Sequence, residues 1–248
     1  IAQTPPDQLA NGVICSSAGN HAQGVALAAR RRGLRAVIVM PKTTPSIKVD
    51  AVVALGGEAV LYGDTYDDAT ARARELEAAE GLCFVHPFND PDVIAGQATV
   101  AAEMEKQWPK RPDAVFVPVG GGGLIGGIGA YLKQRYPDIK IIGVEPIESA
   151  SMYESLRARE IVTLERVGTF ADGVAVKRVG DETFRLASEV VDEIVLVSTD
   201  EICAAIKDIF EDVRAIVEPA GALAVAGLKR YVERRANERS TFVAVNSG

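Results

Sequence analysis

Cysteine and histidine are scarce in this sequence, which holds three cysteines and two histidines among 248 residues. Cys15, Cys83 and Cys203 form no Cys-x-x-Cys pair, and their odd number does not suit a disulfide framework. The two isolated histidines, His21 and His86, do not complete a zinc-binding pattern. We therefore expect no bound metal, and we expect reduced, mostly buried thiols of the kind found in cytoplasmic proteins.

Aromatic residues and positive charge are also in short supply. Phe, Tyr and Trp make up 6% of the chain, and its formal net charge is −7 at pH 7. Nucleic-acid-binding surfaces need clustered basic residues, often with aromatic side chains that stack on bases, so nucleic acid is not an expected partner. The sequence shows no signal peptide and no apolar run long enough to span a bilayer. We therefore expect no membrane partner and a cytoplasmic location.

What the sequence does contain is an ordinary globular composition, 48% hydrophobic and 25% charged, at a length that suits one large or two modest α/β domains. Strands are expected at residues 13–15, 36–40, 59–62, 82–85, 115–119, 140–145, 193–197 and 241–245. Helices are expected at residues 22–32, 46–55, 65–80, 93–108, 124–136, 148–159, 181–190, 199–216 and 218–235. This alternation predicts parallel sheets with helices on both faces. The Pro- and Asn-bearing joint at 86–92 is the expected boundary between a smaller domain, 1–86, and a larger one, 87–248.

The most informative stretch covers residues 114–128, where a predicted buried strand runs into four consecutive glycines, Gly120, Gly121, Gly122 and Gly123. Glycine costs backbone entropy on folding, so four in a row need a compensating role. A sharp turn that points several N–H groups at one place, at the start of a helix, binds phosphate. The alternative is a tight strand-to-helix turn, but such a turn needs only one or two glycines. The next pair, Gly126 and Gly127, would let the helix approach another backbone.

Two more polar segments follow predicted strands, and ligands of parallel sheets bind beyond the carboxyl ends of strands. In residues 16–21, the N–H groups and the hydroxyl of Ser17 could hold a carboxylate, and Asn20 offers an amide; the alternative is a plain helix cap. Ser247 could bond a ligand or cap a following helix. His21 is more easily explained as a structural donor than as a base, and Glu218 before Pro219 as ordinary helix-start chemistry.

A dinucleotide site is a competing interpretation of the glycine-rich stretch. Gly121, Gly123 and Gly126 satisfy the Gly-x-Gly-x-x-Gly pattern between a strand and a helix, and Glu145 ends the next predicted strand, where a ribose-binding acid is expected. The pattern is degenerate in a run so rich in glycine. It also leaves the polar residues 16–21 and Ser247 without a role. A small phosphate-bearing cofactor accounts for all three segments.

Several motifs resemble the pyridoxal-phosphate-dependent threonine dehydratase (threonine ammonia-lyase) family. They are SSAGNHAQGVALAA at residues 16–29, PVGGGGLIGGI at 118–128, FADGVAVKR at 170–178, FEDVR at 210–214 and EPAGAL at 218–223. The last three resemble the biosynthetic form that begins isoleucine synthesis. The resemblance covers essentially the whole chain and implies the tryptophan-synthase-β-like α/β fold, fold type II, with two three-layer domains built on parallel sheets. Serine dehydratase and serine racemase of the same fold are the alternatives within the group.

By this resemblance, the residues that bind the cofactor phosphate are Gly120, Gly121, Gly122, Gly123 and Leu124. Asn20 would bond the ring hydroxyl oxygen and Ser247 the pyridine nitrogen. The residues implied to bind the substrate carboxylate are Ser16, Ser17, Ala18, Gly19, Asn20 and His21. A serine hydroxyl can donate to a neutral pyridine but cannot hold it protonated as a carboxylate would. The ring is then a moderate electron sink, which suits loss of a β-hydroxyl from L-threonine, with 2-oxobutanoate and ammonia as products.

One departure from the family pattern concerns the Schiff-base lysine, which the family carries in a Ser-x-Lys-x-Arg-Gly-Ala motif upstream of the first loop. No such motif occurs here, and Lys48, in Ser46-Ile47-Lys48, lies downstream and lacks the following Arg-Gly. Because the chain opens at Ile1 and stops just after a predicted strand, we expect a fragment that is inactive by itself. The family's C-terminal regulatory domain would also lie outside it. The resemblance implies a homo-oligomer, a tetramer.

Overall fold

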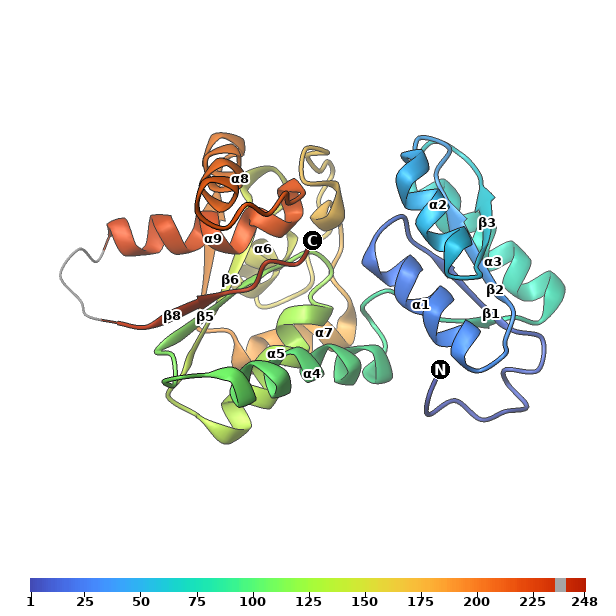
Figure 1. The fold of residues 1–248 in the computed structure, drawn as a ribbon, viewed down its shortest axis with the longest axis horizontal. Helices are drawn as coiled ribbons and strands as arrows, with labels where there is room; N and C mark the ends of the chain where they lie inside the picture. Colours follow the sequence, from blue (N-terminus) through green and yellow to red (C-terminus); the bar gives the residue numbers. More distant parts are fainter. Residues whose placement is uncertain (235–239) are drawn as a thin grey trace. The chain divides into compact units, whose positions relative to one another are not determined.

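The computed structural model describes residues 1–234 and 240–248, and the chain divides into two compact units, Ile1–Asp92 and Val93–Gly248 (Figure 1). The division falls within the first turn of a helix, α4 (Pro91–Gln107), at the end of the joint at residues 86–92 and six residues after the predicted boundary between 86 and 87. Each unit is built on its own four-stranded sheet.

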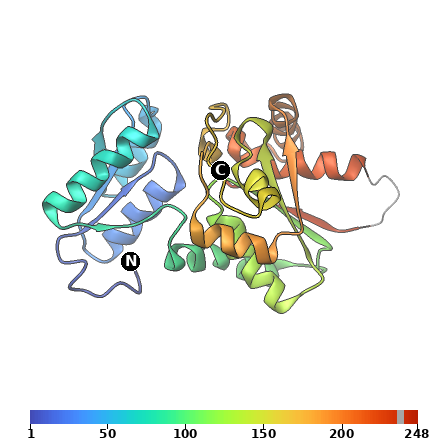
Figure 2. The same ribbon diagram turned by 180° about the vertical axis from the view of Figure 1, so that it is seen from behind.

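The first unit holds a parallel sheet in the strand order β3-β2-β1-β4. Its strands are β1 (Val13–Ser16), β2 (Ala36–Met40), β3 (Glu58–Leu61) and β4 (Cys83–Phe84). Its helices are α1 (Asn20–Arg31), α2 (Ser46–Ala54) and α3 (Tyr66–Glu80). Helices α1 and α2 lie on the face seen in Figure 1, and α3 lies on the face seen in Figure 2.

The second unit holds a parallel sheet in the order β7-β6-β5-β8. Its strands are β5 (Ala114–Pro118), β6 (Lys140–Pro146), β7 (Glu193–Val197) and β8 (Phe242–Ala244). Its further helices are α5 (Gly123–Arg135), α6 (Ser151–Ala158), α7 (Asp181–Val190), α8 (Thr199–Val213) and α9 (Pro219–Glu233), with short 3-10 turns at Ile147–Ser149 and Asp172–Val174.

The two sheets share one topology. In each, the first strand of the unit is an inner strand, the next two are added on one side, and the last strand is added on the other. The strand order therefore reverses beside β1 in the first unit and beside β5 in the second. Open parallel sheets bind ligands outside the carboxyl ends of the strands at such switch points. The loops after β1 and after β5 are two of the three segments that the sequence singles out.

The alternation of side chains along β5 explains how the second unit closes its core. Phe116 faces a cluster completed by α8 and α9, where it packs edge-on against Tyr231 and Phe242. Val115 and Val117 belong to a second cluster on the opposite face. Helices α4, α5 and α7 lie on that side of the sheet (Figure 1). A third cluster, around Ile14, consists of residues of the first unit only, just as the two clusters above consist of residues of the second. No described helix is both long and apolar enough to cross a bilayer.

Helix ends follow local capping chemistry. Thr65 caps α3 in a reciprocal pair with Asp68, as expected for a helix that starts there, and Gly81 ends it in the left-handed conformation. Helix α8 begins at Thr199 as predicted, and Ser198, the residue before it, caps the helix in a reciprocal pair with Glu201. It ends at Val213 rather than at Ile216, because Arg214 takes a φ of 59°. Glu218 is the N-cap residue of α9, with Pro219 in its first turn. Arg235, the predicted end of this helix, lies outside the described residues.

Candidate functional site

The glycine loop after β5, residues 120–123, fits its surroundings only without side chains. Gly122 has a φ of +92°, and a Cβ added there would lie 2.6 Å from Met152 Cε and 3.0 Å from Thr183 Cβ. A Cβ on Gly120 would lie 3.0 Å from Val174 Cα, which is backbone and cannot turn aside. Glycine is therefore required here both by conformation and by space.

The loop carries N–H groups that neither the sheet nor the helix uses. The Val119 N–H still bonds Val144 O across the sheet at 2.9 Å, and the first bond of α5 is Gly126 N–H to Gly122 O at 2.9 Å. Among residues 1–234 and 240–248, no acceptor bonds the N–H groups of Gly121, Gly122 or Gly123, although all three residues are buried. Buried donors without an acceptor are costly, so the loop suits an anionic ligand at the positive end of a helix.

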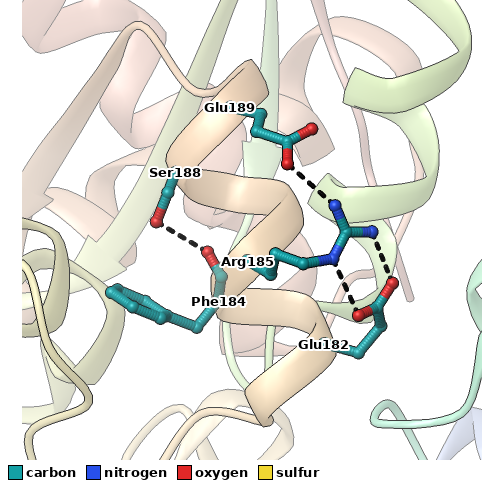
Figure 3. Close-up of polar contacts among 5 residues, drawn as sticks. All are labelled: Glu182, Phe184, Arg185, Ser188 and Glu189. Carbon is teal, nitrogen blue, oxygen red and sulfur yellow. Dashed lines mark hydrogen bonds and ion pairs between the residues drawn. The ribbon is translucent and has the colours of Figure 1, made fainter.

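Two helices support this loop from behind. Thr183, fully buried in the first turn of α7, places its hydroxyl 2.6 Å from Gly121 O and 3.1 Å from Gly180 O. On the exposed side of α7, Arg185 forms ion pairs with Glu182 and Glu189 of the same helix (Figure 3). From α6, Met152 packs against Gly122. Sequence reasoning missed both supporting residues, because neither follows a strand or belongs to a recognisable motif.

Glu145 does not have the role that a dinucleotide site would need. Its carboxylate is fully buried and accepts the N–H groups of Met152 at 2.9 Å and Tyr153 at 2.8 Å, at the start of α6. Burial raises the pKa of this carboxyl to about 8, although the two N–H donors act in the opposite direction. Because this carboxyl is fully buried and directed at the start of α6, it cannot reach a ribose. The dinucleotide interpretation of Gly121, Gly123 and Gly126 therefore lacks the acidic residue that it needs.

The carboxyl end of β8 lies beside the glycine loop, because β8 pairs with β5 in parallel. The Val245 N–H bonds Phe116 O at 3.0 Å, which places Ser247 just past the end of the ladder. Gly248 O accepts the N–H of Glu218 at 3.1 Å, and a Cβ on Gly221 would overlap this same carbonyl oxygen. The chain end is thus packed against the start of α9, at the same edge of the sheet as Gly120–Gly123.

The polar loop of the first unit, residues 16–21, is only partly exposed. Ser16 is buried and its hydroxyl lies 3.0 Å from Thr70 Oγ1, so its side chain serves the packing of α3. Ser17 accepts the Gly19 N–H at 3.3 Å. The capping residue of α1 is Gly19, and no side chain accepts a bond there, so the plain helix-cap interpretation is not realised. Asn20 begins α1 and is exposed.

The two histidines organise the same edge of the first sheet. His21 Nε2 lies 3.0 Å from Val85 O, which ties the start of α1 to the end of β4. Burial lowers the pKa of His21, so the ring is neutral near pH 7 and suits a structural donor. His86 Nδ1 accepts the N–H groups of Phe88 at 3.2 Å and Asn89 at 2.9 Å. Within the described residues, no cluster of His, Cys, Asp and Glu could hold a metal ion.

Comparisons with known proteins agree with this geometry. A family model described as pyridoxal-phosphate dependent enzyme matches residues 2–248. The chain is 56% identical over 248 residues to L-threonine dehydratase biosynthetic IlvA of Pasteurella multocida, covering 100% of this chain and 48% of that protein.

Solved structures give the same picture. The processed form of threonine deaminase isoform 2 from Solanum lycopersicum matches with a TM-score of 0.95 and 51% identity, over 100% of this chain and 68% of that one. Maize serine racemase matches with a TM-score of 0.90 and 32% identity, over 99% of this chain and 76% of that one. The chain spans about half the length of the curated relatives that it matches.

Proposed function

This chain belongs to the pyridoxal-phosphate-dependent enzyme family, and from that premise we propose that its parent protein is a threonine dehydratase. The reaction converts L-threonine to 2-oxobutanoate and ammonia by loss of water and then of the amine, as in the first step of isoleucine synthesis. The two parallel sheets confirm the expected fold type II architecture. The 56% identity to a biosynthetic threonine dehydratase, against 32% to a serine racemase, favours threonine over the serine-specific alternatives.

One observation carries the cofactor assignment: the buried N–H groups of Gly121, Gly122 and Gly123 meet no acceptor among residues 1–234 and 240–248. Together with those of Gly120 and Leu124, they are proposed to bind the phosphate of pyridoxal phosphate. The start of α5 adds the positive end of a helix dipole, which favours a dianionic group. The fit is one of chemistry as well as space, because only a ligand with several acceptor oxygens can satisfy so many donors.

When bound, pyridoxal phosphate supplies the electron sink for breaking the bonds at Cα and Cβ. Ser247, at the carboxyl end of β8, is proposed to donate its hydroxyl hydrogen to the pyridine nitrogen. A hydroxyl leaves that nitrogen neutral, which moderates the electron demand of the ring. In the first unit, Asn20 is proposed to bond the ring hydroxyl oxygen.

The loop at residues 16–21 is proposed to bind the carboxylate of the amino-acid substrate. Its segment Ser17-Ala18-Gly19 precedes α1, and its Asn20 and His21 form the first turn, so its N–H groups lie at the positive end of that helix. Ser16 contributes through its backbone, since its hydroxyl is engaged with Thr70. We further propose a cytoplasmic homo-oligomer, a tetramer by family resemblance; the unpaired cysteines Cys15, Cys83 and Cys203 suit a reducing compartment.

The direct test is an assay of the full-length protein with pyridoxal phosphate and L-threonine, with 2-oxobutanoate as the measured product. Activity on L-serine but not L-threonine would move the protein to a serine-specific relative. Binding of NAD without an absorbance band from pyridoxal phosphate would support the dinucleotide alternative instead. Because the 248-residue chain has no Ser-x-Lys-x-Arg-Gly-Ala motif, we expect no turnover from it alone.

Replacing Gly122 by alanine tests the phosphate loop directly. The new Cβ would meet Met152 Cε at 2.6 Å and would sit at a φ of +92°, so the loop must move. We expect the full-length variant to lose most of its bound cofactor, measured by absorbance after gel filtration. Gly96→Ala is the matched control, since its Cβ meets nothing within 4 Å. Cofactor retention by Gly122→Ala equal to that of the control would contradict the assignment.

A further inference from the structure

The glycine loop has a mechanical weakness that follows from its composition. Four glycines place few steric limits on φ and ψ, so the peptide planes between them can rotate more freely than in any other sequence. A phosphate site needs its N–H groups to point one way before the ligand arrives, since each donor that must be turned weakens binding. Something outside the loop must therefore fix these peptide planes.

Thr183 makes the contact that can do this. Its hydroxyl lies 2.6 Å from Gly121 O, 62 positions away in the sequence, and the residue is fully buried. The second nearby acceptor, Gly180 O, is farther at 3.1 Å, so the single hydroxyl hydrogen is better placed for Gly121. Thr183 Cβ also lies 3.0 Å from where a Cβ on Gly122 would be, so it packs closely on the loop as well.

The direction of this bond determines where the next N–H group points. In a trans peptide the C=O and the following N–H point in opposite directions, and the described chain has no cis peptide bond. Because Gly121 O points at Thr183 on α7, the Gly122 N–H points away from α7. That N–H is one of the three buried donors that no acceptor of the described chain meets.

We propose that Thr183 is a positioning residue for the phosphate site: its hydroxyl holds the Gly121 carbonyl and thereby keeps the Gly122 N–H directed at the bound phosphate. This inference rests on the proposed function of the glycine loop. In this arrangement Thr183 acts through the Gly121 carbonyl and not through a bond of its own to the ligand. Its effect is therefore specific to ligands that carry the phosphate group.

The test compares pyridoxamine phosphate with pyridoxamine, which differ only in the phosphate and have no aldehyde to react with surface lysines. Both are titrated into the full-length protein freed of its cofactor, and dissociation constants are measured by isothermal titration calorimetry. Thr183→Val keeps the shape of the side chain and removes the hydroxyl. Thr183→Ser keeps the hydroxyl and is the matched control. If Thr183→Val fails to fold, Thr183→Ala serves instead, with the same expectation.

We expect Thr183→Val to bind pyridoxamine phosphate about tenfold more weakly, which corresponds to one hydrogen bond of about 1.4 kcal/mol. Its affinity for pyridoxamine should be unchanged, and Thr183→Ser should keep the wild-type preference for the phosphate-bearing ligand. If the role of Thr183 were purely structural, Thr183→Val would bind both ligands more weakly by the same factor. Equal binding of pyridoxamine phosphate by wild type and Thr183→Val would overturn the inference alone. A wild-type chain with no preference between the two ligands would overturn the proposed phosphate site itself.

Discussion

At the scale of single residues, Glu145 shows how a buried carboxyl group can stabilise the start of a helix. Its carboxylate accepts two N–H groups at the start of α6, and α6 in turn presents Met152 to the glycine loop. Burial opposes the ionised form more strongly than the two donors favour it, so the pKa rises from 4.5 to about 8. The folded protein thus binds this proton more tightly than the unfolded chain does.

A pH dependence of stability follows from this raised pKa. The contribution of Glu145 is fully present below pH 4.5 and is lost as the pH rises toward 8. We expect the free energy of unfolding of the wild type, measured in urea relative to Glu145→Gln, to fall by up to about 1.4 kcal/mol per pH unit in this range. A difference that grows with pH would instead mean that the two N–H donors dominate and that Glu145 is ionised.

Residue identities in the candidate site were partly predictable from the sequence. The glycine run is visible because no ordinary turn needs four glycines, and the segments at residues 16–21 and at Ser247 are visible because each follows a strand. Thr183 could not be found in this way, since its neighbours Asp181, Glu182 and Phe184 look like any first turn of a helix. Glu145 could be mistaken for a ribose-binding acid, because the sequence shows that it ends a strand but not that it accepts N–H groups from α6.

At the scale of elements, the packing of α5 on α4 depends on one glycine of an adjacent pair. A Cβ on Gly127 would lie 2.5 Å from Ile94 O and 2.7 Å from Ala98 N, and both are backbone atoms of α4. A Cβ on Gly126 would meet Leu186 at 3.6 Å, an ordinary contact. The expectation that this pair allows close approach to another backbone is confirmed for Gly127.

Replacing Gly127 and Gly126 by alanine should therefore have different effects on the free energy of unfolding. Gly127→Ala pushes two helices apart, and we expect it to lower the free energy of unfolding by about 1–3 kcal/mol. Gly126→Ala should be neutral or raise it by up to about 1 kcal/mol, because alanine favours the helix. Urea denaturation of both variants checks this. Equal effects of the two substitutions on the free energy of unfolding would mean that the approach of α5 to α4 at Gly127 is not tight.

Elements were more predictable than their ends. All eight predicted strands lie where apolar runs indicate them, and the helices that separate successive strands account for parallel pairing. The end of α8 was placed too late, because Ile216 continues the apolar pattern while the backbone already turns at Arg214 with a φ of 59°. A positive φ at arginine has no signature in a single sequence. The early start of α1 at Asn20 has a similar cause, since its cap, Gly19, carries no side-chain signal.

At the scale of the whole molecule, each described core cluster draws its residues from one unit. Leu132 belongs to a cluster of the second unit and Leu82 to the cluster of the first. We expect Leu132→Ala to destabilise its own unit by about 2–5 kcal/mol. Amide hydrogen exchange should then quicken in β5 and β6 and stay unchanged in β2. Leu82→Ala should give the reverse pattern, and a uniform change across both units would refute the division at Asp92.

The shared strand order has a consequence for how each half of the protein is made. In the second unit, β8 is synthesised long after β5, yet it pairs directly with β5. While the chain emerges from the ribosome, β5 therefore lacks a pairing partner on the side that β8 later occupies. Ser247 follows β8, so the contacts proposed for the cofactor in the second unit are complete only after the chain beyond β8 has left the ribosome.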